Sequence, residues 1–282
     1  MLSLGLALGS AALYGLSDFL GGLVSRRASP WQVAIVTQLA AIVLIGAAAL
    51  LMPADPTWVD VGWGALAGIG TGTGTAFLYR GLSSGRMGVV APLSAVGAAL
   101  LPVAVGVATG DRPPLLTWIG IACAVPAIWL VSTSTDAPAA GEIPARLGEG
   151  VVDGALAGLG FGLMFAALGQ VPDTAGLGPL AAAECTSVLA IVAVATPLGQ
   201  RWLPRDRQAA WGSVVGALAA AASIAFLLAT QAGMLAVAAV LASLYPVFTV
   251  LLAASVLRER IHGPQAIGLG LAVVAIALVG MG

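Results

Sequence analysis

The fold is decided by the stretch Leu235-Ala-Val-Ala-Ala-Val-Leu-Ala-Ser-Leu-Tyr-Pro-Val-Phe-Thr-Val-Leu-Leu-Ala-Ala-Ser-Val-Leu257, which precedes Arg258-Glu-Arg-Ile-His-Gly-Pro264 and the apolar run 265–281. Each apolar flank is about as long as the roughly 20 helical residues that cross the hydrocarbon core of a bilayer. The stretch therefore predicts a membrane-spanning helix, a tight charged corner and a second helix. We expect the rest of the chain to be a variation on this unit.

The composition indicates a membrane protein with many spans. Sixty per cent of the residues are hydrophobic and only 8% are charged, whereas a soluble domain carries about 25% charged residues. A basic stripe is absent, which argues against a nucleic-acid partner. Both cysteines lie in apolar stretches, so no disulfide or metal framework is implied. Residues 1–24 lack a basic start and a cleavage motif, and we interpret them as the first span.

Turn-forming residues divide the chain into ten predicted helices, five in each half. The candidate spans are residues 3–24, 31–52, 60–80, 86–108, 115–134, 150–170, 177–199, 209–230, 235–257 and 264–281. Residues 135–149 form the only long polar segment and connect the halves. The predicted architecture is an all-α membrane protein with ten transmembrane helices, in which residues 1–134 and 150–282 are two inverted five-helix repeats packed as one domain.

The two halves carry matching residues at a nearly constant spacing. An offset of 148 residues places Trp211 on Trp63, Gly216 on Gly68, Arg260 on Arg112 and Gly268 on Gly120; an offset of 149 places Pro179 on Pro30 and Thr186 on Thr37. Paired tryptophans and matching charged corners arise by chance less easily than Ala or Gly matches. The pattern therefore predicts a duplication.

A unit of five helices, an odd number, must enter the membrane the other way up when it is copied in tandem. The arginines agree with this inversion. The corners after spans one, three, five, seven and nine hold ten of the arginines, and the remaining corners hold only Arg112. Under the positive-inside rule, this distribution places the arginine-rich corners in the cytoplasm and both termini outside.

With these features the sequence resembles the drug/metabolite transporter superfamily, in its EamA-type branch. The residues that carry the resemblance are Tyr245-Pro-Val-Phe-Thr249, the corner Leu257-Arg-Glu-Arg260, and Ile267-Gly268. In the first half, Pro102 lies four positions late and Asp111 replaces the glutamate. The resemblance covers the whole chain and implies ten helices that transport small solutes. It also implies cytoplasmic termini, the opposite of the orientation that the arginines predict.

Two acidic residues, Asp18 and Glu184, fall inside predicted spans. A charged group at the centre of a membrane helix costs roughly 2.5–3.5 kcal/mol or more, so such residues mark functional sites by default. Asp18 lies about 9 Å from the arginine-rich face, and Glu184 about 10 Å from the opposite face, at 1.5 Å per residue. We therefore expect each to line its own end of a central path, as a proton or amine site. The alternative is that each is protonated or hydrogen-bonded and fixes helix packing.

Three further polar or aromatic side chains are candidates for contact with cargo. Tyr14 and Ser17 share one helix face with Asp18 at i, i+3 and i+4 spacing. The three side chains either bind the amine of a solute or form an interhelical hydrogen-bond cluster. Tyr245, beside a proline in the ninth span, is the best aromatic candidate.

Glycine and threonine alternate over residues 70–75 of the third span. A phosphate loop is excluded, because no strand precedes this run and no lysine follows it. Thr75 and Tyr79 lie on one stripe of the helix, which either lines a cavity or packs where Gly70 and Gly74 admit a second helix. Arg80 is either an anion contact or, as we prefer, a positive-inside anchor.

Prolines inside the fourth and ninth spans occupy helices that the duplication makes equivalent. Pro92 and Pro102 lie in the fourth span, and Pro246 lies in the ninth. Each removes one backbone hydrogen-bond donor and weakens its helix. They are candidate hinges, with static kinks as the alternative.

These features predict a secondary transporter in a bacterial cell membrane. It would export amino acids or amphipathic drug-like solutes by alternating access, with four-helix groups from each repeat rocking about a central cavity. The alternative is an uptake permease or exchanger for sugars, nucleobases or phosphorylated metabolites. An enzyme is disfavoured because no span holds a histidine or a metal-ligand spacing. The expected partners are the solute and the bilayer, with no cofactor, metal or nucleic acid, in a monomer or homodimer.

Overall fold

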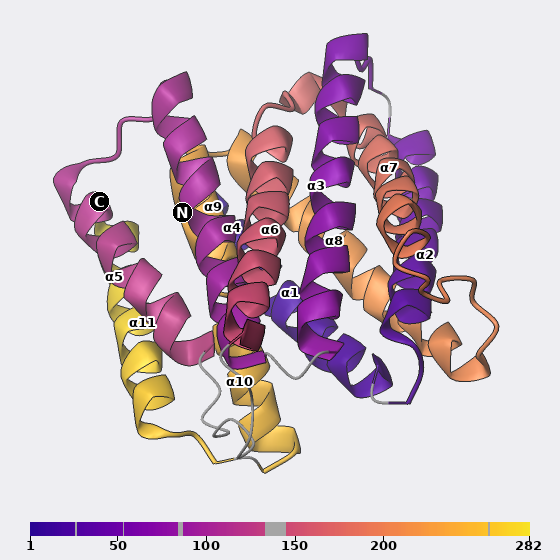
Figure 1. The fold of residues 1–282 in the computed structure, drawn as a ribbon. Helices are drawn as coiled ribbons and strands as arrows, with labels where there is room; N and C mark the ends of the chain where they lie inside the picture. The colour runs from indigo at the N-terminus through magenta and orange to yellow at the C-terminus, as the bar shows by residue number, and fades with distance from the viewer. Residues whose placement is uncertain (26, 53, 84–86, 133–144, 259) are drawn as a thin grey trace.

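The computed structural model describes residues 1–25, 27–52, 54–83, 87–132, 145–258 and 260–282, with the side chains of 79, 81–83, 87–89 and 145–149 left outside this description. Figure 1 shows a bundle of helices, with no strand among the described residues. The helices are α1 (Leu2–Ser25), α2 (Pro30–Leu51), α3 (Trp58–Ser83), α4 (Met87–Thr109), α5 (Leu115–Ser132), α6 (Ala145–Leu168), α7 (Gly178–Ala195), α8 (Gly212–Gln231), α9 (Leu235–Ala242), α10 (Tyr245–Val256) and α11 (Gly263–Met281).

Nine of the ten predicted spans are confirmed, and the tenth is present as a helix. Within the described ranges, nine helical stretches are long and apolar enough to cross a membrane, and one of them is the combined stretch Leu235–Val256. The tenth, α3, has 26 residues and would extend about 39 Å. Its glycines and threonines lower its hydropathy, because neither residue type is strongly apolar. The chain is thus an all-helical, multi-span membrane protein.

Two boundaries differ from the prediction. The helix α6 begins at Ala145, so the last five residues of the expected linker 135–149 are helical. The ninth span is divided into α9 and α10, with Pro246 in the first turn of α10. Residues 133–144 lie outside the described part of the chain.

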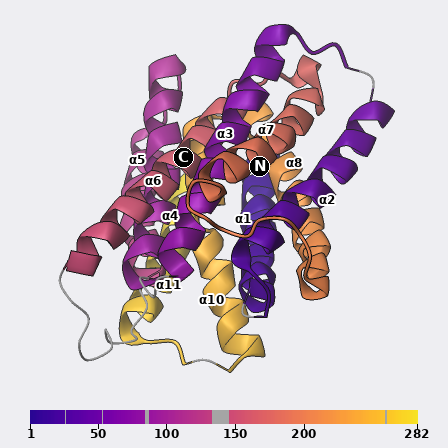
Figure 2. The same cartoon turned by 45° about the vertical axis from the view of Figure 1, so that its right-hand side comes forward.

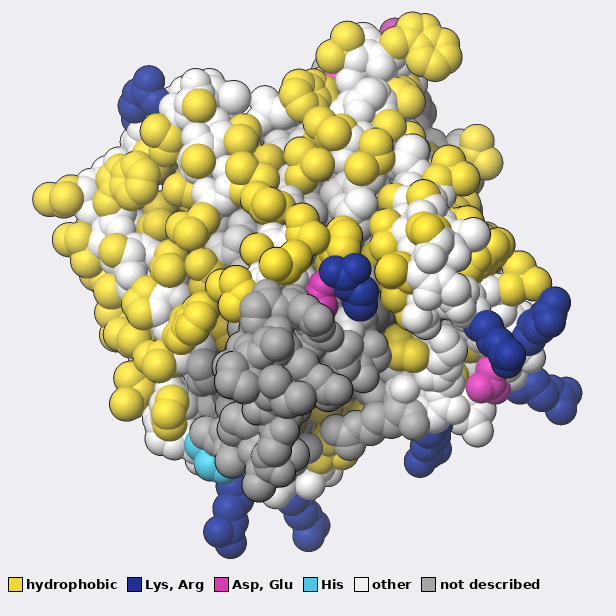
Figure 3. All heavy atoms as spheres, in the orientation of Figure 1, with side chains coloured by type: hydrophobic (Ala, Val, Ile, Leu, Met, Phe, Trp, Pro, Cys, Tyr) yellow, Lys and Arg dark blue, Asp and Glu magenta, His cyan; other side chains and the backbone are white. Residues whose placement is uncertain are grey.

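Successive spans run in opposite directions, with α9 and α10 forming one span, and both termini lie toward the upper end of Figure 1. The last residues of α1, α3, α5, α7 and α10 consequently lie toward the other end. In Figure 3 most arginine side chains gather along the lower edge and lower right, with a separate one at the upper left. We call the end of the bundle that holds most of these arginines the arginine-rich end, and the end that holds both chain termini the terminal end.

The most extensive helix packing joins the two halves of the chain. The helix α3 packs against α6 and α7, and its counterpart α8 packs against α1 and α2. Likewise α4 packs against α6, as α9 and α10 pack against α1. The helices α5 and α11, which are counterparts of each other, lie side by side at one edge (Figure 1), and Figure 2 shows α2 beside α8 at another. Exchange of the halves therefore maps the packing onto itself, as two inverted repeats require.

The same exchange relates individual contacts. The Thr37 hydroxyl on α2 donates to the Gly212 carbonyl on α8 at 3.2 Å, and its counterpart Thr186 on α7 donates to the Ala65 carbonyl on α3 at 2.9 Å. The Gln38 amide on α2 donates to the Ser187 hydroxyl on α7. These two residues are 149 positions apart, which is the offset that aligns Thr37 with Thr186. The pseudo-two-fold axis therefore passes between α2 and α7.

Glycines let the halves approach closely. A Cβ atom on Gly68 would lie 1.9 Å from the Thr186 hydroxyl, and one on Gly216 would lie 2.2 Å from the Thr37 carbonyl oxygen. In lipid, helices associate through close packing and hydrogen bonds rather than through the hydrophobic effect.

The closely packed groups mix helices of both repeats: one contains α3, α4, α6 and α7, and the other contains α1, α2, α8, α9 and α10. The expected four-helix groups from single repeats are therefore not the units of close packing.

Gly216→Ala is expected to destabilise the bundle by about 1–3 kcal/mol, because the added methyl group meets the Thr37 backbone, which cannot move aside freely. The measurement is the apparent Tm of the purified protein in detergent. The matched control is Gly270→Ala, since nothing lies within 4 Å of a Cβ atom at Gly270. Equal Tm values for the two variants would contradict the close approach of α8 and α2.

Candidate functional site

A set of polar side chains from both halves lies near the middle of the bundle. We call it the central polar cluster, and it contains Tyr14 and Asp18 of α1, Ser94 of α4, Glu184 of α7, Ser223 of α8 and Tyr245 of α10. Each residue comes from a helix that packs along the interface between the repeats. The cluster therefore exists only because the halves interlock.

Tyr14 lies near both intramembrane acids. Its hydroxyl and that of Ser223 are hydrogen-bonded at 2.8 Å. The carboxyl groups of Asp18 and Glu184 both lie near enough to act electrostatically on the Tyr14 phenol. The sequence predicted that the acids line separate ends of a path. That arrangement stays a prediction, and both acids act electrostatically on the same phenol.

Tyr245 occupies the same region from the other side. The Asp18 carboxyl group acts on its phenol electrostatically, and the Ser94 side chain lies nearby. The start of α10 is held against α1 at Gly15, where a Cβ atom would lie 2.7 Å from the Tyr245 carbonyl oxygen. The Thr249 hydroxyl also donates to the Gly15 carbonyl at 3.2 Å. Close packing of α1 and α10 thus positions Tyr245 beside Asp18.

The two acids differ in their surroundings. Asp18 is exposed, whereas Glu184 is only 6% exposed, and its Oε2 atom has no hydrogen-bond partner among the described residues. A buried carboxylate without a partner is costly, so Glu184 favours a bound proton or a bound ligand. The cluster therefore presents one accessible and one sheltered carboxyl group.

Large apolar side chains close the bundle between the cluster and the terminal end. The Phe165 ring of α6 lies 4.4 Å from the Phe226 ring of α8 and 6.1 Å from the Tyr14 ring, measured between centroids. Phe165 is 2% exposed and Phe226 is fully buried. All of α9 is buried, whereas in α10 only Pro246 is buried. Within the ninth span, the segment toward the terminal end is therefore more deeply buried than the segment toward the arginine-rich end.

The remaining predicted site residues are Ser17, Thr75 and Tyr79. Ser17 is buried, and its hydroxyl donates to the Val215 carbonyl of α8 at 3.1 Å, which matches the interhelical alternative. Thr75 is half-buried on α3, near the glycines at 72 and 74 that contact α7 and α6. The side chain of Tyr79 lies outside the described part of the chain. A role in cargo binding stays a prediction for all three residues.

The three hinge candidates differ in local structure. The helix α4 continues through Pro92 and Pro102, whereas Pro246 follows the break between α9 and α10. The buried Ser243 hydroxyl at this break has no hydrogen-bond partner among the described residues. Discontinuous membrane helices are frequent at the sites of inverted-repeat transporters. A hinge role stays a prediction, and Pro246 has the strongest structural support.

An ion pair that the sequence did not reveal joins the halves. Arg80 of α3 donates to the Asp153 carboxyl group of α6 through both Nε and Nη2, and the guanidinium carbon lies 4.7 Å from the centroid of the Phe77 ring. Asp153 is buried. The sequence placed both residues at span ends, where charges are ordinary. Their repeat counterparts are Leu228 and Leu8, so the pair exists only at the arginine-rich end.

No group of three or more His, Cys, Asp or Glu residues that could hold a metal ion occurs in the described ranges. The cluster instead offers carboxyl and hydroxyl groups from facing helices. Such groups can bind an amine, exchange a proton or accept hydrogen bonds from a polar solute.

Asp153→Leu is expected to destabilise the protein, since the half-buried Arg80 loses a charged partner. Breaking a fully buried pair costs about 3–5 kcal/mol. The Arg80 side chain is 36% exposed, so we expect about 2 kcal/mol after screening by solvent. The double variant Arg80→Leu/Asp153→Leu, which copies the opposite repeat, should recover most of the loss in apparent Tm. Simple addition of the two single losses would show that the pair does not couple α3 to α6.

Comparisons with known proteins agree with this architecture. Residues 149–281 match the EamA-like transporter family. No curated protein sequence matches the chain. A solved structure titled "Crystal structure of protein" is similar over 99% of this chain and 98% of that chain, with a TM-score of 0.73 and 17% identity. At that identity the likeness shows a shared fold over the whole length. The second half of the chain therefore matches the EamA-like transporter family, a family of membrane transporters for small solutes, which is consistent with the drug/metabolite transporter superfamily.

Proposed function

We propose that this chain is a secondary transporter that exports small amine-bearing solutes, such as amino acids or amphipathic drug-like cations, by alternating access. The single observation that supports this most is the central polar cluster, which is built from helices of both repeats. Its acidic members are Asp18 and Glu184, and its other members are hydroxyl and phenol groups. An amine fits such a site because a carboxylate can accept its hydrogen bonds and balance its charge.

The uneven packing supports a state that is closed toward the terminal end. The Phe165 and Phe226 rings block that end, while Asp18 is exposed. With the arginine-rich end in the cytoplasm, as the positive-inside rule favours, this arrangement corresponds to loading from the cytoplasm. In an inverted repeat, exchange of the two packings produces the opposite state. Cargo drives the change only if it binds the two states with different affinity.

The runner-up function is an uptake permease or exchanger for sugars, nucleobases or phosphorylated metabolites. Hydroxyl groups and two tyrosines in the cluster would suit a neutral polar solute. Phosphorylated cargo is less suitable, because phosphate sites normally use arginine or lysine. Arg80 is paired with Asp153 and is not a member of the cluster.

The test begins with a thermal-shift screen of the purified protein against amino acids, cationic drugs, nucleobases and sugars, because a ligand stabilises the native state in proportion to its binding. Flux of the best hit is then measured in proteoliposomes. Asp18→Asn should weaken binding of an amine by about 10- to 100-fold, which corresponds to the roughly 1.5–3 kcal/mol of a hydrogen bond to a charged group.

Asp55→Asn is the matched control, because Asp55 is an exposed carboxylate in a corner at the terminal end and should leave binding unchanged. An Asp18→Asn protein that binds and transports the amine like the parent would remove Asp18 from the site. Stabilisation by sugars or nucleobases, with none by amines, would favour the runner-up function.

A further inference from the structure

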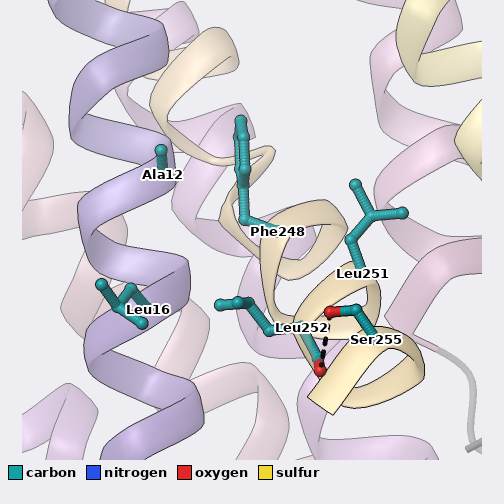
Figure 4. A pocket seen from close by; sticks show the side chains of 6 residues that line it. All are labelled: Ala12, Leu16, Phe248, Leu251, Leu252 and Ser255. Atoms are coloured by element: carbon teal, nitrogen blue, oxygen red, sulfur yellow. Dashed lines mark hydrogen bonds between the residues drawn. The ribbon is translucent and has the colours of Figure 1, made fainter. Parts of the chain in front are cut away.

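A groove runs between α1 and α10 on the side of their contact away from the central polar cluster. Ala12 and Leu16 of α1, with Phe248, Leu251 and Leu252 of α10, line a space of about 300 Å³ (Figure 4). Ser255 lies at one end, and its hydroxyl donates to the Leu252 carbonyl at 3.3 Å. The only polar side chain of the lining thus has a partner. The wall is apolar, and Leu251 is 44% exposed.

The groove follows the direction of lipid chains. From Phe248 to Ser255 the helix α10 advances seven residues, or about 10 Å at 1.5 Å per residue. One leaflet of a bilayer contributes about 15 Å of hydrocarbon. The groove therefore extends from near the membrane surface at the arginine-rich end to about the middle of the bilayer, within the leaflet at that end.

Both helices that form the groove end shortly before an arginine. The helix α1 ends at Ser25, two residues before the exposed Arg27, and α10 ends at Val256, two residues before the exposed Arg258. Arginine side chains at a membrane surface attract anionic lipid headgroups, at about 1 kcal/mol each. An apolar groove with cations near its mouth suits a molecule that has a long apolar chain and an anionic headgroup.

We propose that the groove between α1 and α10 is a binding site for an anionic phospholipid of the leaflet at the arginine-rich end. One acyl chain lies along Leu16, Phe248 and Leu252, and the headgroup lies beside Arg27 and Arg258. The close contact between α1 and α10 at Gly15 separates the acyl chain from Asp18. The lipid site is therefore distinct from the proposed cargo site. The site abuts α10, the more loosely packed part of the ninth span.

The test uses native mass spectrometry of the full chain, purified in detergent with equal amounts of phosphatidylglycerol and phosphatidylcholine and without cargo. The parent protein should retain phosphatidylglycerol preferentially. Ala12→Phe fills the groove and should lower the retained lipid at least fivefold. Its matched control, Ala277→Phe, adds the same ring at an exposed position of α11 and should leave retention unchanged. Leu251→Trp fills the groove from its exposed side and replaces Ala12→Phe if that variant fails to fold.

The headgroup is tested separately. Removal of the charge in Arg27→Gln and in Arg258→Gln should reduce the preference for phosphatidylglycerol by roughly fivefold each, whereas Arg112→Gln at the terminal end should not change it. Retention that survives both groove-filling variants, or that falls equally in Ala277→Phe, would overturn the groove as the site. Preference that survives both arginine variants would overturn the anionic headgroup. The readout needs no transport, so it is independent of the proposed export function.

Discussion

Close approach of helix backbones across the two halves is the constraint on which the rest of the structure depends. Inside a bilayer the hydrophobic effect does not draw helices together, so small residues and buried hydrogen bonds must do so. Gly68 and Gly216 serve this purpose at equivalent places, beside Thr186 and Thr37. Because the contacts join opposite repeats, neither half packs alone. The central polar cluster follows from the same interlocking, since its residues come from helices of both halves.

Much of the fold could be predicted because its determinants are periodic. Lipid-spanning length, turn chemistry and the arginine distribution identified ten spans, and the offset of 149 residues that aligned Thr37 with Thr186 also relates Gln38 to Ser187, which are hydrogen-bonded at the axis. Asp18, Glu184 and Tyr245 were recognisable because a charge at membrane depth is costly and an aromatic beside an intramembrane proline is unusual. These features could be predicted because their physical cause lies in the residue itself and its neighbours along the sequence.

The remaining features depend on which helix faces which, and spacing does not specify that. Asp153 looked like an ordinary charge at a span end until the packing of α3 on α6 placed Arg80 beside it. Ser94 and Ser223 are single hydroxyl groups among many, and only their positions beside Tyr245 and Tyr14 distinguish them. Ser17 shares a predicted face with Asp18, yet a small rotation about α1 directs it to the backbone of α8. Pro246 coincides with a helix break, whereas Pro92 and Pro102 lie in a continuous helix.

The pseudo-two-fold axis between α2 and α7 is tested most directly by thiol cross-linking in native membranes. Cysteines replace Gln38 and Ser187 in a chain whose own Cys123 and Cys185 are changed to alanine, and a short bifunctional thiol reagent is added. The account predicts an efficient cross-link within one chain for Gln38→Cys/Ser187→Cys and none for Gln38→Cys/Thr117→Cys, whose second site lies on α5. Absence of the first cross-link in a correctly folded protein would contradict the interlocked, inverted arrangement of the two repeats.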